Sequence, residues 1–374
     1  MKNTKKLKIF IIAGEVSGDV LGGKIMREMS KDIDFIGIGG QNMISAGLKP
    51  LFPMSDLSVM GVFEVLGHAR TLTRRIRQTV TAIINEKPDI VLTIDSPGFA
   101  KSVVGKVKKS NVLKTTKFYH VVAPQVWAWG AKRASKYAKI FDKLYTFFDF
   151  ERPYFERYGL CTIAVGHPVA EGLDNYHADK KQDKIITLVP GSRMSEVKKL
   201  LPVFHKTIDL LASQGYKDYK FVIPTVETTE AYIKKDVQNW AIKPILVPSN
   251  ERYNVYANTF IAIAASGTVS AELAIMHIPA IVVYKMNPLT ILLAHILLTV
   301  KWASLVNILM DKTIYPELLG GAVTPKSIVN LVKKLTLPNN RKAMINDLKA
   351  ADNKWRKSHK NPAKLIADDI LNSQ

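Results

Sequence analysis

Cysteine is almost absent from this 374-residue chain, which contains only Cys161. A single cysteine excludes an internal disulfide and any metal site built from several thiolates, and it is typical of a reducing, cytoplasmic compartment. The eight histidines follow neither the H-E-x-x-H spacing nor a clustered ligand pattern. We therefore expect no metal centre and no cofactor.

Long apolar runs are also missing. The longest uncharged segment, residues 286–300, is shorter than the roughly 20 residues that a membrane-spanning helix requires. It fits a buried helix or a helix that lies on a bilayer. Near the N-terminus, the apolar run 9–13 is too short for the core of a signal peptide, and Glu15 and Asp19 follow it at once. We interpret this run as the first buried strand.

Acidic residues are outnumbered, since 53 Lys and Arg against 32 Asp and Glu leave a formal net charge of +21. Such a surface attracts nucleic acid, anionic lipid headgroups or phosphorylated substrates. The sequence has no RNP, KH or zinc-finger pattern, and its basic residues are spread along the chain rather than interleaved with exposed aromatics. We therefore expect no nucleic-acid partner.

Short β-branched runs alternate with helical patterns in both halves of the chain. Continuously apolar strands separated by helices indicate a parallel sheet that is covered on both faces. The chain is also longer than a single hydrophobic core allows. We predict two doubly wound α/β domains joined near the polar stretch 171–184. The predicted strands are 8–12, 34–39, 89–95, 117–124, 143–148, 184–190, 220–225, 245–248, 260–265 and 279–284.

Ligands of such sheets lie beyond the carboxyl ends of the strands. In the second half, one strand ends in LVPGSRMSEV, residues 188–197. Gly191 allows a sharp bend, Ser192 offers a hydroxyl, and Arg193 can hold a phosphate with two donors. A capped turn with a solvated arginine is the simpler interpretation, but a later strand repeats the arrangement.

That later strand runs into FIAIAASGTVSAELAI, residues 260–275. Ser266, Gly267 and Thr268 stand where a helix begins, so their hydroxyls, their N–H groups and the helix dipole favour an anion. Glu272 follows one turn later, on the same helix face as Thr268. Because a carboxylate suits ribose hydroxyls rather than a phosphate, the two strand ends indicate a site for a nucleoside diphosphate.

The first half has its own strand-end motifs. The glycine-rich AGEVSGDVLGG, residues 13–23, lacks the spacing of a dinucleotide or P-loop motif and also fits a plain tight turn. Asp95 ends the strand 89–95, where it fits a general base or a helix N-cap. VAPQVWAWGAKR, residues 122–133, pairs two tryptophans with two basic residues, which suits a sugar face and a phosphate but also an ordinary core.

Residues 59–78 combine an apolar face with a rim of arginines. Such a segment can dip among acyl chains while its cations meet anionic headgroups, or it can be an amphipathic helix packed on the core. The apolar residues are Val59, Met60, Val62, Phe63, Val65, Leu66 and Leu72, and the arginines are Arg70, Arg74, Arg75 and Arg77.

These motifs together resemble the lipid-A-disaccharide synthase family, inverting glycosyltransferases of the GT-B type. They occur in family order along nearly the whole chain. The motifs are AGEVSGDVLGG, VMGVFEVLGH, IDSPGF, VAPQVWAWG, VGHPV, LVPGSRMSEVKKLLP, ASGTVSAELAI, YKMNP and SLVNIL. The sequence departs from the family pattern at Gly98, Ala100, Val306 and Gly320, which concerns acceptor contacts and acyl-chain preference.

The resemblance implies two Rossmann-like domains that face each other across a cleft. We expect an acceptor and lipid domain at 1–170, a nucleotide-sugar domain at 171–345, and a segment at 346–374 that returns to the first domain. The implied reaction joins UDP-2,3-diacylglucosamine to 2,3-diacylglucosamine 1-phosphate through a β-1,6 bond and releases UDP. The implied location is the anionic, cytoplasmic face of the inner membrane of a Gram-negative bacterium, and the resemblance allows a homodimer.

The resemblance also implies residue roles, none of which needs a metal. Asp95 would be the general base, and Arg193 would neutralise the leaving diphosphate. The implied nucleotide-binding residues are Gly191, Ser192, Arg193, Ser266, Gly267, Thr268, Glu272 and Asn307. The implied acceptor and lipid contacts are Glu15, Ser17, Gly18, Asp19, Met60, Val62, Phe63, Glu64, Gln125 and Trp127.

Two other enzymes of the same fold are alternatives, a UDP-N-acetylglucosamine 2-epimerase and the transferase that completes the peptidoglycan lipid precursor. Both have the two-domain cleft and a Ser-Gly segment near a glutamate. Neither is expected to carry VWAW and MGVFEVLGH together. A basic protein that binds nucleic acid or a membrane surface without catalysis is the more distant alternative.

Overall fold

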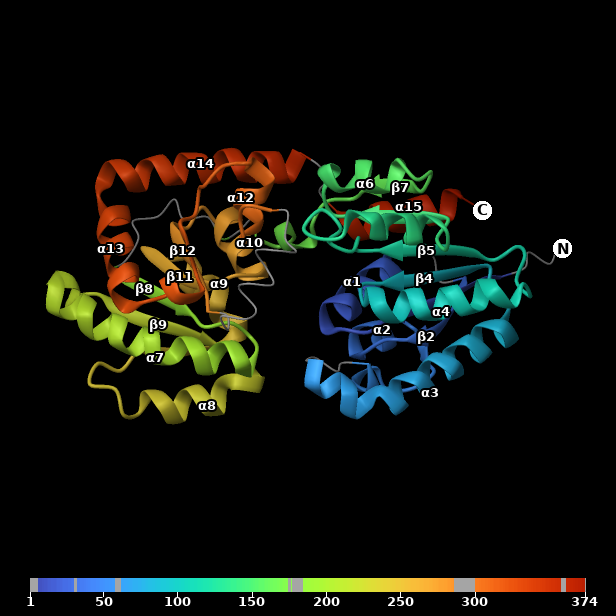
Figure 1. Cartoon of the computed structure of the whole chain (residues 1–374), viewed down its shortest axis with the longest axis horizontal. Coiled ribbons are helices and arrows are strands. Elements are labelled where there is room, and N and C mark those ends of the chain that lie inside the picture. The colour runs from blue at the N-terminus through green and yellow to red at the C-terminus, as the bar shows by residue number, and fades with distance from the viewer. Residues whose placement is uncertain are drawn as a thin grey trace. The chain divides into compact units, whose positions relative to one another are not determined.

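The computed structural model describes residues 6–29, 32–57, 62–173, 176, 184–285, 300–357 and 361–373, except for the side chains of 62–69, 170, 356 and 357. The chain divides into two compact units. The first consists of Met1–Pro168 and Ser358–Gln374, and the second consists of Val169–Lys357. Both are α/β units with parallel sheets (Figure 1), which confirms the predicted fold class.

The described part of the first unit contains a seven-stranded parallel sheet in the order β3-β2-β1-β4-β5-β6-β7. Its strands are β1 (Leu7–Ala13), β2 (Ile33–Ile38), β3 (Lys49–Pro50), β4 (Ile90–Ile94), β5 (Lys117–Val121), β6 (Lys143–Thr146) and β7 (Cys161–Ala164). Its helices are α1 (Val16–Glu28), α2 (Gln41–Ser45), α3 (Val62–Glu86), α4 (Pro97–Ser110), α5 (Ala134–Ala138), α6 (Arg152–Glu156) and α15 (Pro362–Asn372). Short 3-10 turns are η1 (Met54–Asp56), η2 (Ala131–Arg133) and η3 (Asp149–Glu151).

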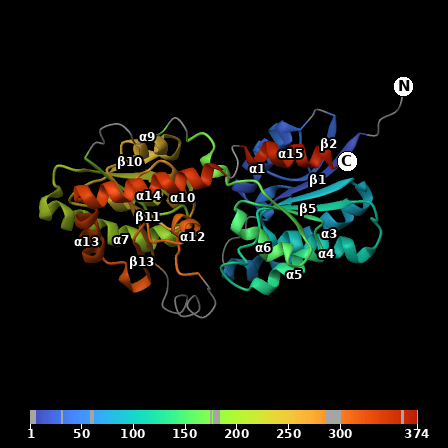
Figure 2. The same ribbon diagram turned by 90° about the horizontal axis from the view of Figure 1, so that it is seen from above.

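Strand β1 shows why this sheet is covered on both faces. Ile9 and Ile11 pack with side chains of α1 and α15, whereas Phe10 and Ile12 pack with side chains of α4 and α5. All four are at most 1% exposed. Because successive side chains of a strand point to opposite faces, an unbroken apolar run must be sandwiched between two helical layers. Figure 2 shows α15 alongside α1, and the two helices are in contact.

The described part of the second unit contains a six-stranded parallel sheet in the order β10-β9-β8-β11-β12-β13. Its strands are β8 (Ile185–Val189), β9 (Lys220–Thr225), β10 (Ile245–Pro248), β11 (Ile261–Ala265), β12 (Ala280–Tyr284) and β13 (Glu317–Leu319). Its helices are α7 (Met194–Leu211), α8 (Glu227–Val237), α9 (Arg252–Ala257), α10 (Thr268–Ile275), α12 (Leu305–Met310), α13 (Pro325–Thr336) and α14 (Pro338–Lys357). Short turns are η4 (Pro168–Ala170), η5 (Ala212–Tyr216), η6 (Ser249–Glu251) and η7 (Gly320–Ala322).

Both sheets reverse their strand order once, between β1 and β4 in the first unit and between β8 and β11 in the second. At such a switch point the loops after the two central strands leave toward opposite faces and open a crevice at the carboxyl edge. Each unit therefore has one position where its fold favours a ligand. The strand-end motifs of the sequence fall at these two positions.

The C-terminal segment differs from the expected 346–374. Helix α14 ends at Lys357 within the second unit, where it contacts α10, α12 and α13. Only the part after it belongs to the first unit, because Ile366, Ala367 and Ile370 of α15 join the core beside α1. The predicted linker 171–184 lies mostly outside the described residues, and the units divide after Pro168.

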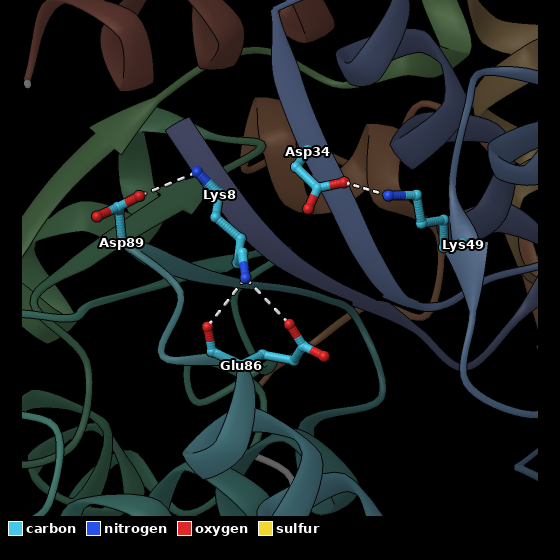
Figure 3. Close-up of polar contacts among 5 residues, drawn as sticks. All are labelled: Lys8, Asp34, Lys49, Glu86 and Asp89. Atoms are coloured by element: carbon cyan, nitrogen blue, oxygen red, sulfur yellow. Dashed lines mark hydrogen bonds and ion pairs between the residues drawn. The ribbon is translucent and has the colours of Figure 1, made fainter. Parts of the chain in front are cut away.

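Figure 3 shows the opposite, amino edge of the first sheet, where charged side chains pair with one another. Lys8 Nζ donates to a carboxylate oxygen of Glu86 at 3.0 Å, and the Lys8 N–H donates to Asp89 at 2.9 Å. Lys49 Nζ donates to Asp34 at 2.7 Å. These acids and bases are satisfied by each other, which identifies this edge as structural and leaves the carboxyl edge for ligands.

Candidate active site

The second unit has a cavity of about 280 Å³ at the carboxyl edge of its sheet. Seven of the eight residues predicted to hold a nucleotide line it, and they come from the segments that follow β8 and β11, the second of which includes the start of α10, on the two sides of the switch point. The seven are Gly191, Ser192, Arg193, Ser266, Gly267, Thr268 and Glu272. The structure thus brings together two segments that are more than 70 residues apart in the sequence.

Backbone conformation makes two glycines necessary in these loops. Gly191 has φ +98°, and a Cβ atom there would be 2.3 Å from Glu196 Oε2. Gly267 has φ +142° and is the N-cap residue of α10. Residues other than glycine rarely adopt these backbone angles. Both loops therefore expose backbone close to the cavity.

The start of α10 gives the cavity a preference for anions. Gly267 and Thr268 are exposed, and the first N–H groups of a helix have no partner within the helix. Ser266 Oγ donates to the Ala303 carbonyl at 3.0 Å, so this hydroxyl is already oriented by a neighbouring loop. N–H groups and the helix dipole at such a terminus favour phosphate.

Arg193 is the N-cap residue of α7, and its side chain is 59% exposed. Its guanidinium is 3.2 Å from Glu196 Oε1, a carboxylate that also lines the cavity. An exposed ion pair of this kind contributes little stability. Arg193 can therefore exchange this partner for a phosphate at small cost.

Glu272 is 9% exposed and is held by helix α9. Its Oε1 accepts a hydrogen bond from the Tyr253 hydroxyl at 3.0 Å and one from Arg252 Nη2 at 3.4 Å. Burial raises the pKa of the Glu272 carboxyl, and the Arg252 charge opposes this shift. Glu272 also lines the cavity, so its carboxylate is fixed in place where a ligand can reach it.

Sequence reasoning missed polar residues that line the cavity from β9, η6 and α9, which are Thr225, Ser249, Arg252 and Tyr256. Arg252 follows a strand end, ILVP, just as Arg193 and Thr268 follow theirs. Its position after a strand end is the sequence signal that could have identified Arg252 as a site residue. The separation of 20 residues between Arg252 and Glu272 hides their contact, because it is made across two elements.

Asn307, the eighth predicted nucleotide residue, lies apart from the other seven. It is fully buried and does not line the cavity. Its Oδ1 accepts from the N–H groups of Ile314 and Tyr315, and its Nδ2 donates to the Tyr315 carbonyl and to Glu317. These four hydrogen bonds use the capacity of an asparagine side chain. In this structure Asn307 supports the fold, and its contact with a nucleotide stays a prediction.

Asp95 stands at the switch point of the first unit, directly after β4. Its φ is +54° and that of Ser96 is +46°, so two consecutive non-glycine residues are left-handed. The Ser96 N–H donates to Asp95 Oδ1 at 2.8 Å. Burial raises the pKa of the Asp95 carboxyl, partly offset by this hydrogen bond. Backbone strain of this kind is common at catalytic residues.

The predicted acceptor residues of the first unit separate into two groups. Glu15 is half-buried, and Ser17 and Gln125 are exposed, so all three can meet a ligand. Gly18 is buried where α1 passes close to Ile94, so its small size serves helix packing. Met60 lies outside the described residues, as do the side chains of Val62, Phe63 and Glu64.

Asp19 and Trp127 are buried and hydrogen-bonded inside the unit, so their predicted acceptor contacts stay predictions. Asp19 is 3% exposed, and its carboxylate accepts from the backbone N–H groups of Gly40, Asn42 and Met43, so it caps α2. Trp127 is 7% exposed, and its indole N–H donates to Glu151 at 3.0 Å. Their polar groups are used inside the unit, which leaves Trp129 as the exposed tryptophan of this loop.

Within the described ranges, no helix is long and apolar enough to cross a bilayer, and no group of three or more His, Cys, Asp or Glu side chains could hold a metal ion.

The four arginines predicted to rim the apolar face of α3 fall into two groups. Arg70, Arg74 and Arg77 line a shallow surface hollow, whereas Arg75 pairs with Asp56 and stacks over the Phe52 ring.

Solved structures of related shape show the fold. A UDP-GlcNAc 2-epimerase from Neisseria meningitidis bound to UDP-GlcNAc has a TM-score of 0.64 at 12% identity, with 98% of this chain and 100% of that chain covered. A glycotransferase of kitacinnamycin has a TM-score of 0.63 at 11% identity, with 98% of each chain covered. At such identities the likeness concerns architecture alone, so it does not favour the epimerase alternative.

Sequence relatives are more specific. The family model described as lipid-A-disaccharide synthetase matches residues 9–369. The lipid-A-disaccharide synthase of Rhodospirillum centenum is 38% identical, with 98% of this chain and 95% of the relative covered. That of Rickettsia bellii is 37% identical, with 88% and 89% covered. The chain therefore belongs to the lipid-A-disaccharide synthase family.

Proposed function

We propose that the chain transfers 2,3-diacylglucosamine from UDP-2,3-diacylglucosamine to the 6-hydroxyl of 2,3-diacylglucosamine 1-phosphate. The products are the β-1,6-linked disaccharide 1-phosphate and UDP. The family supplies the reaction. The observation that carries the residue roles is the cavity of the second unit, where an anion-binding helix start and a buried carboxylate line one space.

UDP binding is assigned to this cavity. The diphosphate meets the N–H groups at the start of α10 and the Arg193 guanidinium, while the ribose hydroxyls donate to Glu272. This division follows charge, because the phosphates need donors and the hydroxyls can donate to a carboxylate. Arg252 donates to Glu272, and its positive charge opposes the rise that burial causes in the pKa of this carboxyl. The proposed site uses no metal ion.

Asp95 is assigned the role of general base. The acceptor 6-hydroxyl gives its proton to the Asp95 carboxylate as its oxygen forms a bond to the anomeric carbon of the donor. The bond from that carbon to the diphosphate oxygen breaks, and UDP leaves from the opposite face. Attack and departure on opposite faces invert the anomeric centre. Positive charge from Arg193 and the start of α10 stabilises the leaving diphosphate.

The test is to incubate the purified protein with both diacylated sugars and to look for the tetra-acyl disaccharide 1-phosphate by mass spectrometry. We expect one UDP for each disaccharide formed. Incubation with UDP-N-acetylglucosamine alone should leave it unchanged, whereas an epimerase would invert its C2 centre, either with UDP still attached or with hydrolysis by water to free sugar and UDP. If UDP-N-acetylglucosamine is consumed in that second reaction and no disaccharide forms in the first, the assigned function is refuted.

We also propose that the enzyme works at the anionic, cytoplasmic surface of the inner membrane. Arg70, Arg74 and Arg77 support this, because their spacing of four and three residues places them on one side of α3. Sedimentation with vesicles that contain anionic lipid should recover the protein at low salt, and replacing these three arginines with glutamine should weaken recovery. Equal recovery with neutral vesicles would contradict an electrostatic contact.

A further inference from the structure

A stacked pair of side chains, Trp129 and Arg133, stands in the loop between β5 and α5. The Arg133 Cζ atom is 3.4 Å from the centre of the Trp129 ring, close enough for a cation–π contact. Its Nη2 donates to the Trp129 carbonyl at 2.9 Å and to the Gln125 carbonyl at 3.3 Å. The guanidinium is thus held in one orientation by its own loop.

The charge of Arg133 has no acidic partner among the described residues. Its Nε is buried and makes no hydrogen bond, and burial lowers the pKa of the group. The other arginines near strand ends differ, since Arg193 pairs with Glu196 and Arg252 with Glu272. A partly buried guanidinium with an unpaired Nε and no carboxylate beside it is stabilised by an anion that reaches it.

The pair lies on the same edge of the sheet as Asp95. Strands β4 and β5 are neighbours, and the Asp95 N–H donates to the Val121 carbonyl at 2.9 Å. Tyr137 of α5, the helix that begins directly after Arg133, is tied to the segment after Asp95, because its hydroxyl donates to the Pro97 carbonyl at 3.0 Å. An acceptor whose hydroxyl reaches Asp95 therefore has Arg133 and Trp129 nearby.

We propose that Arg133 binds the phosphate of the acceptor sugar and that the ring face of Trp129 not covered by Arg133 lies against the sugar. Trp129 is 44% exposed, so part of its ring is accessible to a ligand. The assignment rests on the proposed function and adds an acceptor-specificity site to it. It implies that Arg133 distinguishes a phosphorylated acceptor from the same diacylglucosamine without phosphate, while binding of the UDP-sugar does not depend on it.

The experiment compares two acceptors, 2,3-diacylglucosamine 1-phosphate and its dephosphorylated form, with wild type, Arg133→Met and Lys132→Met. Lys132 is the matched control, an exposed cation of the same loop. We expect wild type and Lys132→Met to prefer the phosphorylated acceptor in kcat/KM. Arg133→Met should lose about 10- to 100-fold of that preference, as expected for one charge-assisted contact. The KM for the UDP-sugar should not change.

Thermal unfolding shows whether Arg133→Met keeps its fold, and Arg133→Lys, which keeps the charge but not the two-carbonyl fork, should recover part of the preference. An unchanged preference in Arg133→Met, or an equal loss in Lys132→Met, would overturn the assignment to Arg133 while leaving the glycosyltransferase function standing. Absence of transfer by wild type would remove both proposals.

Discussion

At the scale of single residues, the first unit uses unusual backbone to present Asp95. Left-handed angles at Asp95 and Ser96 occur together with φ +74° at Val122, a β-branched residue after the neighbouring strand. Each such residue costs of order 1 to 3 kcal/mol. Gly14 completes the arrangement, since a Cβ atom there would be 2.3 Å from Ser96 Oγ. The fold tolerates this cost around the carboxylate to which the proposed mechanism assigns the role of general base.

The variant Asp95→Asn tests the role of this carboxylate. We expect kcat to fall at least about 100-fold, because an amide cannot accept the proton. In wild type, kcat/KM should rise with pH as Asp95 ionises, with its midpoint above the ordinary range of aspartate because burial raises the pKa. Asp149→Asn is the control, an aspartate of the same unit with a 68% exposed side chain. Near-normal turnover in Asp95→Asn would remove it from the mechanism.

Glu151 is a second buried acid, and it holds the loop that carries Trp129. It is 4% exposed and accepts from the Trp127 indole and from the N–H groups of Phe147 and Phe148. Burial raises the pKa of the Glu151 carboxyl from 4.5 to about 7, against the effect of these three donors. The folded protein therefore keeps a proton that the unfolded chain releases between these values.

Stability should consequently fall as pH rises from about 4.5 through 7, because in that window the native state binds more protons than the unfolded state. The contribution is complete below pH 4.5. We expect the free energy of urea unfolding to decrease less between pH 5 and pH 8 in Glu151→Gln than in wild type. Exposed Glu156 provides the control variant Glu156→Gln. If the free energy of unfolding depends on pH identically in wild type and in Glu151→Gln, the pKa of Glu151 has its ordinary value.

At the scale of elements, Asp19 joins two helices. It belongs to α1, yet its carboxylate accepts hydrogen bonds from backbone N–H groups at the start of α2 and from the Asn42 side chain. Asp19→Ala would leave these buried donors without an acceptor, so we expect a loss of about 2 to 4 kcal/mol in urea unfolding. Asp32→Ala, at an exposed position near the start of β2, should have little effect.

The same variant distinguishes a structural role from the acceptor role predicted from the family motif. If Asp19 has a structural role, the Asp19→Ala protein that remains folded should have nearly the wild-type KM for the acceptor. Normal stability together with a raised acceptor KM would restore the original prediction.

The glycines of segment 13–23 allow close packing of α1, because a Cβ atom at Gly22 or Gly23 would lie within 3 Å of Met43 or Asn42, respectively.

The sequence was sufficient for elements with strong local patterns. Apolar strands such as β1 and β11 are recognisable because they are buried on both faces, and their strand-end loops could be placed from the fold rule alone. Strands β3 and β13 have two and three residues, too few for any periodicity. Trp127 and Trp129 are two residues apart in a loop, where no period decides which one is buried. The pairing of Arg252 with Glu272 requires the three-dimensional structure.

At the scale of the whole molecule, the chain begins and ends in the same unit. Helix α15 packs on α1, and Asp369 accepts from Lys143 Nζ and from the Tyr145 hydroxyl, each at 2.6 Å. Tyr145 is fully buried, so its hydroxyl depends on this acceptor. The first unit therefore depends on a segment made after the second unit is complete.

This dependence predicts different behaviour of the two units in Asp369→Ala. The first unit should lose about 2 to 3 kcal/mol, because the Tyr145 hydroxyl and the partly buried Lys143 lose their acceptor. The second unit should keep its stability and its affinity for UDP. Urea unfolding followed with and without UDP separates the two, since a ligand stabilises only the unit that binds it.

The neighbouring Asp368 supplies the control, because it pairs only with Lys364 on the same exposed helix face, at 3.4 Å. Asp368→Ala should leave both transitions in place, since exposed pairs of this spacing contribute at most about 0.5 kcal/mol. If Asp369→Ala and Asp368→Ala unfold alike, the hydrogen bonds of α15 do not hold the first unit. If UDP shifts both transitions of wild type equally, the units do not unfold independently and the separation of their roles fails.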